Sequence, residues 1–276
     1  MINRQNIRLM AIGAHPDDCE SKVGGIAMNV LQRGGKVMFV SATNGNAGHH
    51  ELTREDLKAR RFQEASKVAE EFGILYRIMD NDDCTLQNTL KNRDELISLI
   101  RSFRPDVIVT HRINDYHTDH RNTGLLVQDA SFLLRVPLVC PQSPALEYEP
   151  IILYMGDGFK KPNRLQPDMV VDVEEYLDAK AKMLYHHDSQ FFEWLPWLDG
   201  ALDKVPHDRE GRIEWCRRWL LARSEYLKGP QVLQSYRMIY GDKAKETLRC
   251  LEAFEISEYG ASVTPEELRQ LFGIPV

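Results

Sequence analysis

Several features that mark common classes of protein are missing from this sequence. No stretch approaches the roughly 18 consecutive apolar residues that a membrane-spanning helix needs. The start of the chain, MINRQNIRLMAIG, has no basic segment followed by a long apolar run, so a secretory signal peptide is not predicted. Basic residues are not in excess, since 35 Lys and Arg face 41 Asp and Glu for a formal net charge of −6. This balance argues against nucleic acid or an anionic membrane as a partner.

Cysteine is scarce and follows no recognisable pattern. The five cysteines are scattered and no two have CxxC spacing; they are Cys19, Cys84, Cys140, Cys216 and Cys250. An odd number of scattered cysteines favours reduced thiols over a disulfide framework. We therefore expect a cytoplasmic protein.

The glycine-rich turn of a dinucleotide-binding fold is also missing. Such a fold carries GxGxxG directly after its first strand. Here the corresponding turn, residues 13–25, reads GAHPDDCESKVGG. Its acidic residues Asp17, Asp18 and Glu20 would repel a pyrophosphate, whereas a metal ion fits their charge.

Apolar runs alternate with helical patterns along the first two thirds of the chain. The patterns predict strands at 7–13, 36–42, 74–79, 106–111, 151–155 and 169–172, and helices at 22–34, 57–72, 94–103 and 123–134. Alternating strands and helices imply βαβ units and a mostly parallel sheet. We therefore predict an α/β fold, a Rossmann-like three-layer sandwich.

A domain boundary is predicted near residue 190. Residues 1–190 would form the Rossmann-like catalytic domain, and residues 191–276 a mainly helical C-terminal extension packed on that domain, with helices at 214–227 and 265–272. All four tryptophans lie in this extension: Trp194, Trp197, Trp215 and Trp219. One interpretation is that they pack the extension against the sheet. The alternatives are a substrate lid or a subunit contact, and a subunit contact would imply a homo-oligomer.

Two motifs rich in histidine and aspartate follow strands that a doubly wound sheet brings together. HPDD at residues 15–18 follows the first predicted strand, and HTDH at residues 117–120 follows the fourth. In the strand order 3-2-1-4 these two strands are neighbours at the topological switch point, where such folds bind ligands. The two motifs are therefore expected to share one crevice.

The residue types in these motifs suit a catalytic metal. His15 and Asp18 are three positions apart and can face one point in a helical turn, and His120 adds a ligand from the opposite loop. Two histidines and one carboxylate with an open position for water describe a catalytic zinc site. The same set also holds iron(II), so the residues predict a metal site that suits either zinc or iron(II).

The other residues of the motifs suggest acid–base roles. Asp17 could take a proton from a water whose pKa the metal lowers, and later pass it to the leaving nitrogen. His117, if protonated, could stabilise an oxyanion, and Asp119 could orient one of the histidines. Each motif alone also has a structural explanation, because Asp18 could simply be a helix N-cap.

Taken together, these residues resemble the PIG-L/LmbE-like family of N-acetylglucosaminyl deacetylases. The AHPDDxE motif of that family is seen as AHPDDCE at 14–20, and its HPDH motif as HTDH, with threonine in place of proline. Shorter matches are SATNGNAGH at 41–49, RFQEA at 61–65, KMLYHHDSQ at 182–190 and, more weakly, EAF at 252–254. The similarity covers most of residues 7–190 and touches the tail.

The resemblance implies a set of site residues. It implies zinc ligands His15, Asp18 and His120, the general base Asp17, and supporting roles for His117 and Asp119. It also implies that Arg61 reaches substrate or intermediate, although a solvated helix arginine is the alternative.

Three further residues are given roles outside the chemistry. His187 would join the sheet to the tail or lie behind the metal ligands, and Glu20 would support the metal loop through hydrogen bonds. Cys19 is interpreted as a small buried residue, because zinc already has three ligands.

The expected reaction is metal-assisted hydrolysis of an N-acyl amide, with acetate released from an N-acetylated sugar or glycoconjugate. Two alternatives are a metal-dependent amidase or esterase acting on a non-sugar substrate, and a non-catalytic metal-containing binding protein. The presence of Asp17 argues against the last, since a pure binder needs no free base. Specificity is expected from loops at 44–56, 136–150 and 191–212.

Overall fold

One mostly parallel sheet organises the computed structural model, which describes residues 6–274. Its strands lie in the order β3-β2-β1-β4-β5-β7-β6. They are β1 (Arg8–Gly13), β2 (Lys36–Ser41), β3 (Leu75–Ile78), β4 (Val107–Thr110), β5 (Ile151–Met155), β6 (Met169–Asp172) and β7 (Leu251–Ile256). The pairs from β3 through β5 are parallel, and β7 runs antiparallel to both of its neighbours.

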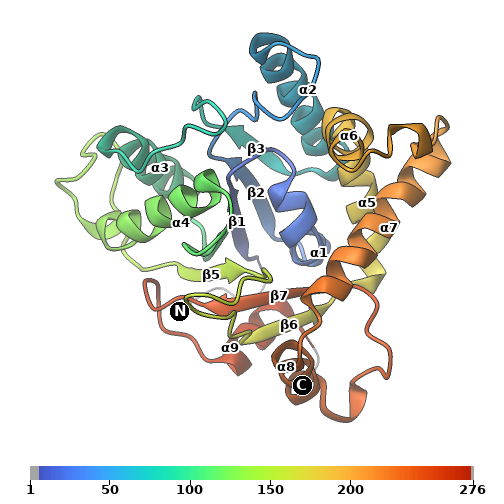
Figure 1. Ribbon diagram of the computed structural model, residues 1–276. Coiled ribbons are helices and arrows are strands. Elements are labelled where there is room, and N and C mark those ends of the chain that lie inside the picture. Colours follow the sequence, from blue (N-terminus) through green and yellow to red (C-terminus); the bar gives the residue numbers. More distant parts are fainter. Residues whose placement is uncertain (1–5, 275–276) are drawn as a thin grey trace.

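Helices cover both faces of the sheet (Figure 1). They are α1 (Asp18–Gln32), α2 (Arg54–Phe72), α3 (Leu90–Phe103), α4 (Thr118–Ser131), α5 (Leu177–Tyr185), α6 (Leu195–Leu198), α7 (Arg209–Leu227), α8 (Pro230–Tyr240) and α9 (Pro265–Phe272). Successive β1 residues point to opposite faces: Leu9 and Ala11 join the core under α1, α5 and α7, whereas Met10 and Ile12 join the core under α3 and α4. The three-layer α/β prediction is therefore confirmed.

The helices α1, α2, α3, α4 and α7 all begin earlier than their apolar periodicity predicted, and two of these early starts fall in the motifs. The helix predicted at 22–34 begins at Asp18, and the helix predicted at 123–134 begins at Thr118. The first turn of each of these two helices is polar, so the apolar pattern starts only after it. As a consequence, Asp18 and His120 occupy the first turns of helices whose N-termini lie at the carboxyl edge of the sheet.

The C-terminal part is mainly helical, as expected, but it also supplies a strand. β7 inserts between β5 and β6, and neither β7 nor α8 was predicted. Two glutamates interrupt the apolar pattern of β7, and Glu252 is nonetheless buried because it faces the ammonium of Lys180. The division near residue 190 remains a prediction.

Within residues 6–274, no helix combines the length and the apolar character that crossing a bilayer requires.

Candidate active site

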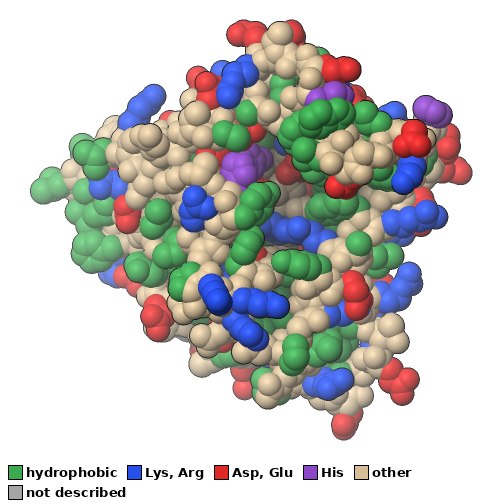
Figure 2. All heavy atoms as spheres, in the orientation of Figure 1, with side chains coloured by type: hydrophobic (Ala, Val, Ile, Leu, Met, Phe, Trp, Pro, Cys, Tyr) green, Lys and Arg blue, Asp and Glu red, His purple; other side chains and the backbone are tan. Residues whose placement is uncertain are grey.

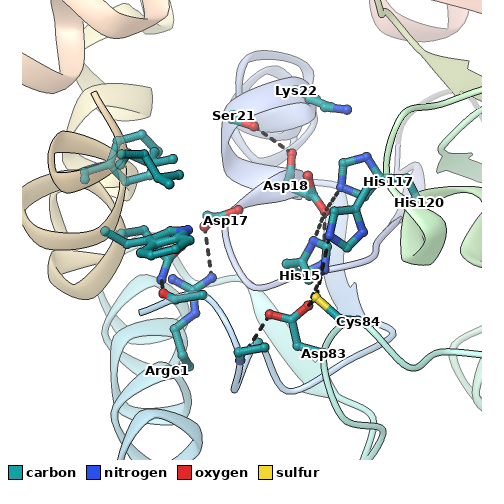
Figure 3. Close-up of a pocket in the computed structure, with 18 of the residues that line it drawn as sticks. His15, Asp17, Asp18, Ser21, Lys22, Arg61, Asp83, Cys84, His117 and His120 are labelled. Carbon is teal, nitrogen blue, oxygen red and sulfur yellow. Dashed lines mark hydrogen bonds and ion pairs between the residues drawn. The ribbon is translucent and has the colours of Figure 1, made fainter. Parts of the chain in front are cut away.

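The two motifs meet at the carboxyl ends of β1 and β4, which are paired in parallel. The turn after β1 carries His15 and Asp17, and Asp18 is the first residue of α1. His117 caps the N-terminus of α4, and His120 lies in its first turn. Figure 3 shows these side chains gathered around one space, with Asp17 on the side of Arg61 and the histidines opposite.

The carboxylate of Asp18 lies at the centre of the cluster. Its Oδ2 accepts hydrogen bonds from the backbone N–H groups of Ala14 at 3.1 Å and His15 at 2.9 Å. The same oxygen lies 3.5 Å from Nδ1 of His15 and 3.5 Å from Nε2 of His120. The ring centroids of the two histidines are 5.3 Å apart. The three predicted ligands are thus brought together.

Carboxylates stand behind both histidines. Nε2 of His15 lies 3.4 Å from Oδ2 of the buried Asp119 and 3.1 Å from Oδ1 of Asp83. Nδ1 of His120 lies 3.0 Å from Oδ1 of Asp115. A carboxylate behind a histidine fixes the ring and raises its basicity, as at many metal sites. Asp119 therefore faces a histidine, as predicted, whereas Asp83 and Asp115 were missed.

His111 is a further residue that sequence reasoning missed. Its buried Nε2 lies 3.2 Å from Oδ2 of Asp18, and its ring stacks on that of His120 with centroids 4.0 Å apart. Burial, and then the charge of His120, lowers the pKa of His111 to about 3, which favours the neutral ring. Its position at the carboxyl end of the fourth predicted strand was the one available signal.

The side chains fit a divalent transition metal. Among the described residues, four sets of three donor groups have all their ligand atoms within 4.8 Å of one another: His15, His117 and His120; Asp18, His111 and His120; Asp83, Cys84 and His117; and His15, Asp83 and Asp119. Imidazole and carboxylate donors suit zinc and iron(II). The predicted trio of His15, Asp18 and His120 is not itself one of the four sets; its members belong to the first two, which share His120.

Asp17 is held in a backbone conformation that non-glycine residues rarely adopt. Its φ is 117°, and Oδ2 accepts a hydrogen bond from the guanidinium of Arg61 at 2.9 Å. Such outliers cost about 1–3 kcal/mol and cluster at functional sites. Burial raises the pKa of the Asp17 carboxyl to about 6, and the charge of Arg61 opposes part of the rise.

His117 is placed to donate from its Nε2 side. Its Nδ1 accepts a hydrogen bond from the backbone N–H of Asp119 at 3.2 Å, so a proton on the neutral ring resides on Nε2. Burial, followed by the charges of His15 and His120, lowers the pKa of His117. The ring is therefore suited to donate as a neutral imidazole, whereas the sequence suggested a protonated one.

Arg61 connects Asp17 to a buried network that reaches Ser189. The Arg61 side chain is 1% exposed, and its Nη1 lies 3.5 Å from Glu64. Glu64 accepts hydrogen bonds from the backbone and hydroxyl of Ser189, each at 2.8 Å. Arg61 is therefore no solvated surface arginine.

The role predicted for Glu20 needs correction. Its Oε1 lies 2.8 Å from Nε2 of His187, and both side chains are fully buried. Glu20 therefore pairs with His187 instead of supporting the metal loop, because α1 turns its side chain toward α5 and its C-terminal turn. His187 therefore joins α1 to the segment that follows α5, so the predicted contact between the sheet and the tail is not the one that its side chain makes. Cys19 is buried as expected, with its thiol facing the carbonyl of Ala11 at 3.4 Å.

A pocket of about 390 Å³ opens in front of the cluster. Residues 45–48 and 190–198 contribute to its wall, so two of the three predicted specificity loops reach it. Residues 136–150 do not line the pocket, because carbonyls of this segment bind the buried guanidinium of Arg101 on α3. Trp194 and Trp219 line the pocket, whereas Trp197 is 45% exposed and Trp215 packs against the core.

The fold and the cluster define an α/β domain with a candidate metal centre at its switch point. The model of the PIG-L family, described as GlcNAc-PI de-N-acetylase, matches residues 10–131. This match confirms the resemblance over residues 10–131.

Two curated relatives are similar to this chain in sequence. The chain is similar to diacetylchitobiose deacetylase of Thermococcus kodakarensis, 27% identical over 202 residues, or 69% of this chain and 74% of the relative. It is also similar to mycothiol S-conjugate amidase of Streptomyces coelicolor, 28% identical over 56% of this chain and 62% of the relative.

Two solved structures share the fold. One is N,N'-diacetylchitobiose deacetylase from Pyrococcus horikoshii, with a TM-score of 0.66 and 22% identity, covering 91% of this chain and 84% of the other. The second is the 4-carboxy-2-hydroxymuconate hydratase GalB from Pseudomonas putida, with a TM-score of 0.69 and 18% identity, covering 94% and 98%. Because a hydratase also has this fold, the fold alone does not define the reaction.

Proposed function

We propose that this protein is a metal-dependent N-deacetylase that removes the acetyl group from an N-acetylated sugar or glycoconjugate. The observation that carries the proposal is the position of Asp17. Its carboxylate lines the same pocket as the cluster of His15, Asp18 and His120 but points to Arg61 instead of joining them. The family match and the similarity to a deacetylase and an amidase support hydrolysis of an amide bond.

His15, Asp18 and His120 would hold the metal, and zinc suits two imidazoles and one carboxylate. A bound divalent cation supplies Lewis acidity and lowers the pKa of a water molecule that it holds. Iron(II) is the alternative, since the same ligands accept it.

Residues of this chain would then carry the proton transfer and stabilise the tetrahedral intermediate. Asp17 accepts the proton of the attacking water and delivers it to the amide nitrogen as the C–N bond breaks, which releases acetate and a free amine. Arg61 holds the carboxylate of Asp17 in position, and the Nε2–H of His117 donates to the oxygen of the tetrahedral intermediate. Asp119 restrains the ring of His15 from behind.

The test combines a substrate panel with two variants. Protein depleted of metal by a chelator and reloaded with zinc or iron(II) is incubated with N-acetylated sugars, and acetate release is measured. Asp17→Asn should keep the metal and lose turnover, whereas His120→Ala should lose both. A His120→Ala variant with full metal content and full rate would show that the ligand assignment is wrong, and an unaffected Asp17→Asn variant would refute the general base.

A further inference from the structure

Two basic side chains inside the pocket take no part in the proposed hydrolysis. Lys22 comes from α1 and Arg223 from α7, and both line the pocket together with His120 and Trp219. Figure 2 shows histidine and basic side chains in the hollow of this face, with hydrophobic side chains around it. The two cations are close enough that, after burial, the charge of Arg223 is the largest cause lowering the pKa of Lys22.

The two cations have no carboxylate partner among residues 6–274. Lys22 Nζ lies 3.4 Å from an imidazole nitrogen, Nδ1 of His111. The guanidinium carbon of Arg223 lies 5.5 Å from the centroid of the Trp219 ring. Both side chains are half-buried. A basic side chain that is partly withdrawn from solvent without a counter-ion is costly, so the arrangement suits an anion that arrives from outside.

The acidic residues nearby are already engaged elsewhere. Asp157 receives two hydrogen bonds from Arg112, at 2.7 and 2.6 Å. Asp115 faces His120, and Glu252 pairs with Lys180. Asp18, the remaining acid near Lys22, accepts hydrogen bonds from the backbone of Ala14 and His15. Within residues 6–274, Lys22 and Arg223 are therefore basic side chains of this corner without an ion pair of their own.

The position of the pair relative to the metal cluster is also defined. The ring of His111 lies between Lys22 and Asp18, with its Nδ1 facing the ammonium and its Nε2 facing the carboxylate. Ser21 lies beside Lys22 on the pocket wall, and a small extension of about 20 Å³ continues between Ser21, Ser224 and the two cations. An anionic group held here would lie one imidazole ring from the proposed metal ligands.

We propose that Lys22 and Arg223 form an anion subsite that binds a carboxylate or phosphate group carried by the N-acetylated substrate. The inference rests on the proposed deacetylase function and narrows its substrate class to acidic N-acetyl sugars or glycoconjugates. The guanidinium supplies a planar pair of donors for such a group, and the ammonium adds a second positive charge.

Three substrates test this subsite. Acetate release is compared for neutral N-acetylglucosamine, for N-acetylglucosamine 6-phosphate as the phosphate arm, and for N-acetylmuramic acid as the carboxylate arm. At least one acidic substrate should be preferred about tenfold or more in kcat/KM, since a hydrogen bond to a charged group contributes about that factor.

The variants Arg223→Gln and Lys22→Met should reduce this preference toward unity, mainly through KM. Arg218→Gln, on the exposed side of α7, is the matched control and should keep it.

A binding measurement separates this inference from the proposed function. The same three sugars are titrated into the Asp17→Asn variant, with and without Arg223→Gln, and the tryptophan fluorescence is followed because Trp219 lies beside Arg223. Equal turnover and equal binding of neutral and acidic sugars would overturn the subsite while the deacetylase stands. Binding of an acidic sugar that depends on Arg223, without acetate release by the unmodified protein, would leave the subsite and refute the deacetylase.

Discussion

The guanidinium of Arg61 lies 2.9 Å from Oδ2 of Asp17, although the two residues are 44 positions apart in the chain. Asp17 belongs to the turn after β1, and Arg61 comes from α2, which also contacts the π-helical turn at Ser189–Trp194. The proposed base is therefore positioned by Arg61, whose neighbour Glu64 is held by Ser189 at the start of this turn.

Removal of this guanidinium should reduce turnover without loss of metal. In Arg61→Gln, Asp17 loses its charged partner, and misplacement of a catalytic group by about 1 Å can lower the rate about 100-fold. We expect a fall in kcat of this size for the best N-acetylated substrate, with unchanged metal content by elemental analysis. Lys67→Gln on the exposed face of α2 is the control. A variant that folds, binds metal and retains its full kcat would contradict the positioning role.

Asp115 should matter for metal affinity rather than for chemistry. Its Oδ1 lies 3.0 Å from Nδ1 of His120, and it also accepts the backbone N–H of His117 at 3.0 Å. Loss of a carboxylate behind a metal-binding histidine typically weakens metal affinity about 10–100-fold. Asp115→Asn should show this loss in competition with a chromogenic chelator.

The control for this prediction is Asp129→Asn, on the exposed side of α4, where the carboxylate accepts from Asn88. An affinity equal to that of the unmodified protein in Asp115→Asn would show that Asp115 does not orient His120.

Glu193 should make part of the stability depend on pH. Burial alone would raise its pKa, but hydrogen bonds to Arg60 at 2.8 Å and to His49 at 2.8 Å lower it below its ordinary value. A depressed pKa means that the carboxylate stabilises the fold above its unfolded pKa and that this contribution is lost as the pH falls through the lower, folded pKa. Because the side chain is 34% exposed, the contribution should not exceed about 1 kcal/mol.

The measurement is urea unfolding of Glu193→Gln between pH 7 and pH 3. The variant should be less stable than the unmodified protein at pH 7, and the difference should shrink as the pH falls. Glu95→Gln, at an exposed position of α3, should show no such trend. A difference that grows toward low pH would have the wrong sign and would reject the assigned contacts.

The main site was predictable because topology and local spacing agree. Buried parallel strands identify β1 and β4, and a doubly wound sheet must place the ends of these strands side by side. His111, Asp83 and Asp115 were not predictable in the same way. Asp83, for example, follows β3 in a loop without repeating spacing, and it reaches His15 only through the fold of that loop.

The same reasoning explains the missed strand. LEAFEI reads as neither an alternating nor a continuously apolar strand, because whether Glu252 is solvated or buried depends on Lys180, which lies 72 positions earlier. Pairing between distant charges is invisible to local periodicity. The contribution of β7 to the sheet therefore follows from tertiary contacts.

This buried pair should be among the most sensitive positions of the fold. Glu252 accepts hydrogen bonds from Lys180 and from the backbone N–H groups of Gly25 at 2.7 Å and Ile26 at 2.9 Å, and it is 2% exposed. Loss of one partner leaves an ammonium group buried without a counter-charge, so Glu252→Gln should lower the free energy of unfolding by about 3–5 kcal/mol. Replacing both residues, in Lys180→Met with Glu252→Leu, should cost less than the single change, since no charge is then left unpaired.

Urea unfolding measures the stability of both variants, with Glu258→Gln just beyond β7 as the exposed control. If Glu252→Gln matches that control, the ion pair does not hold β7 and α5 together.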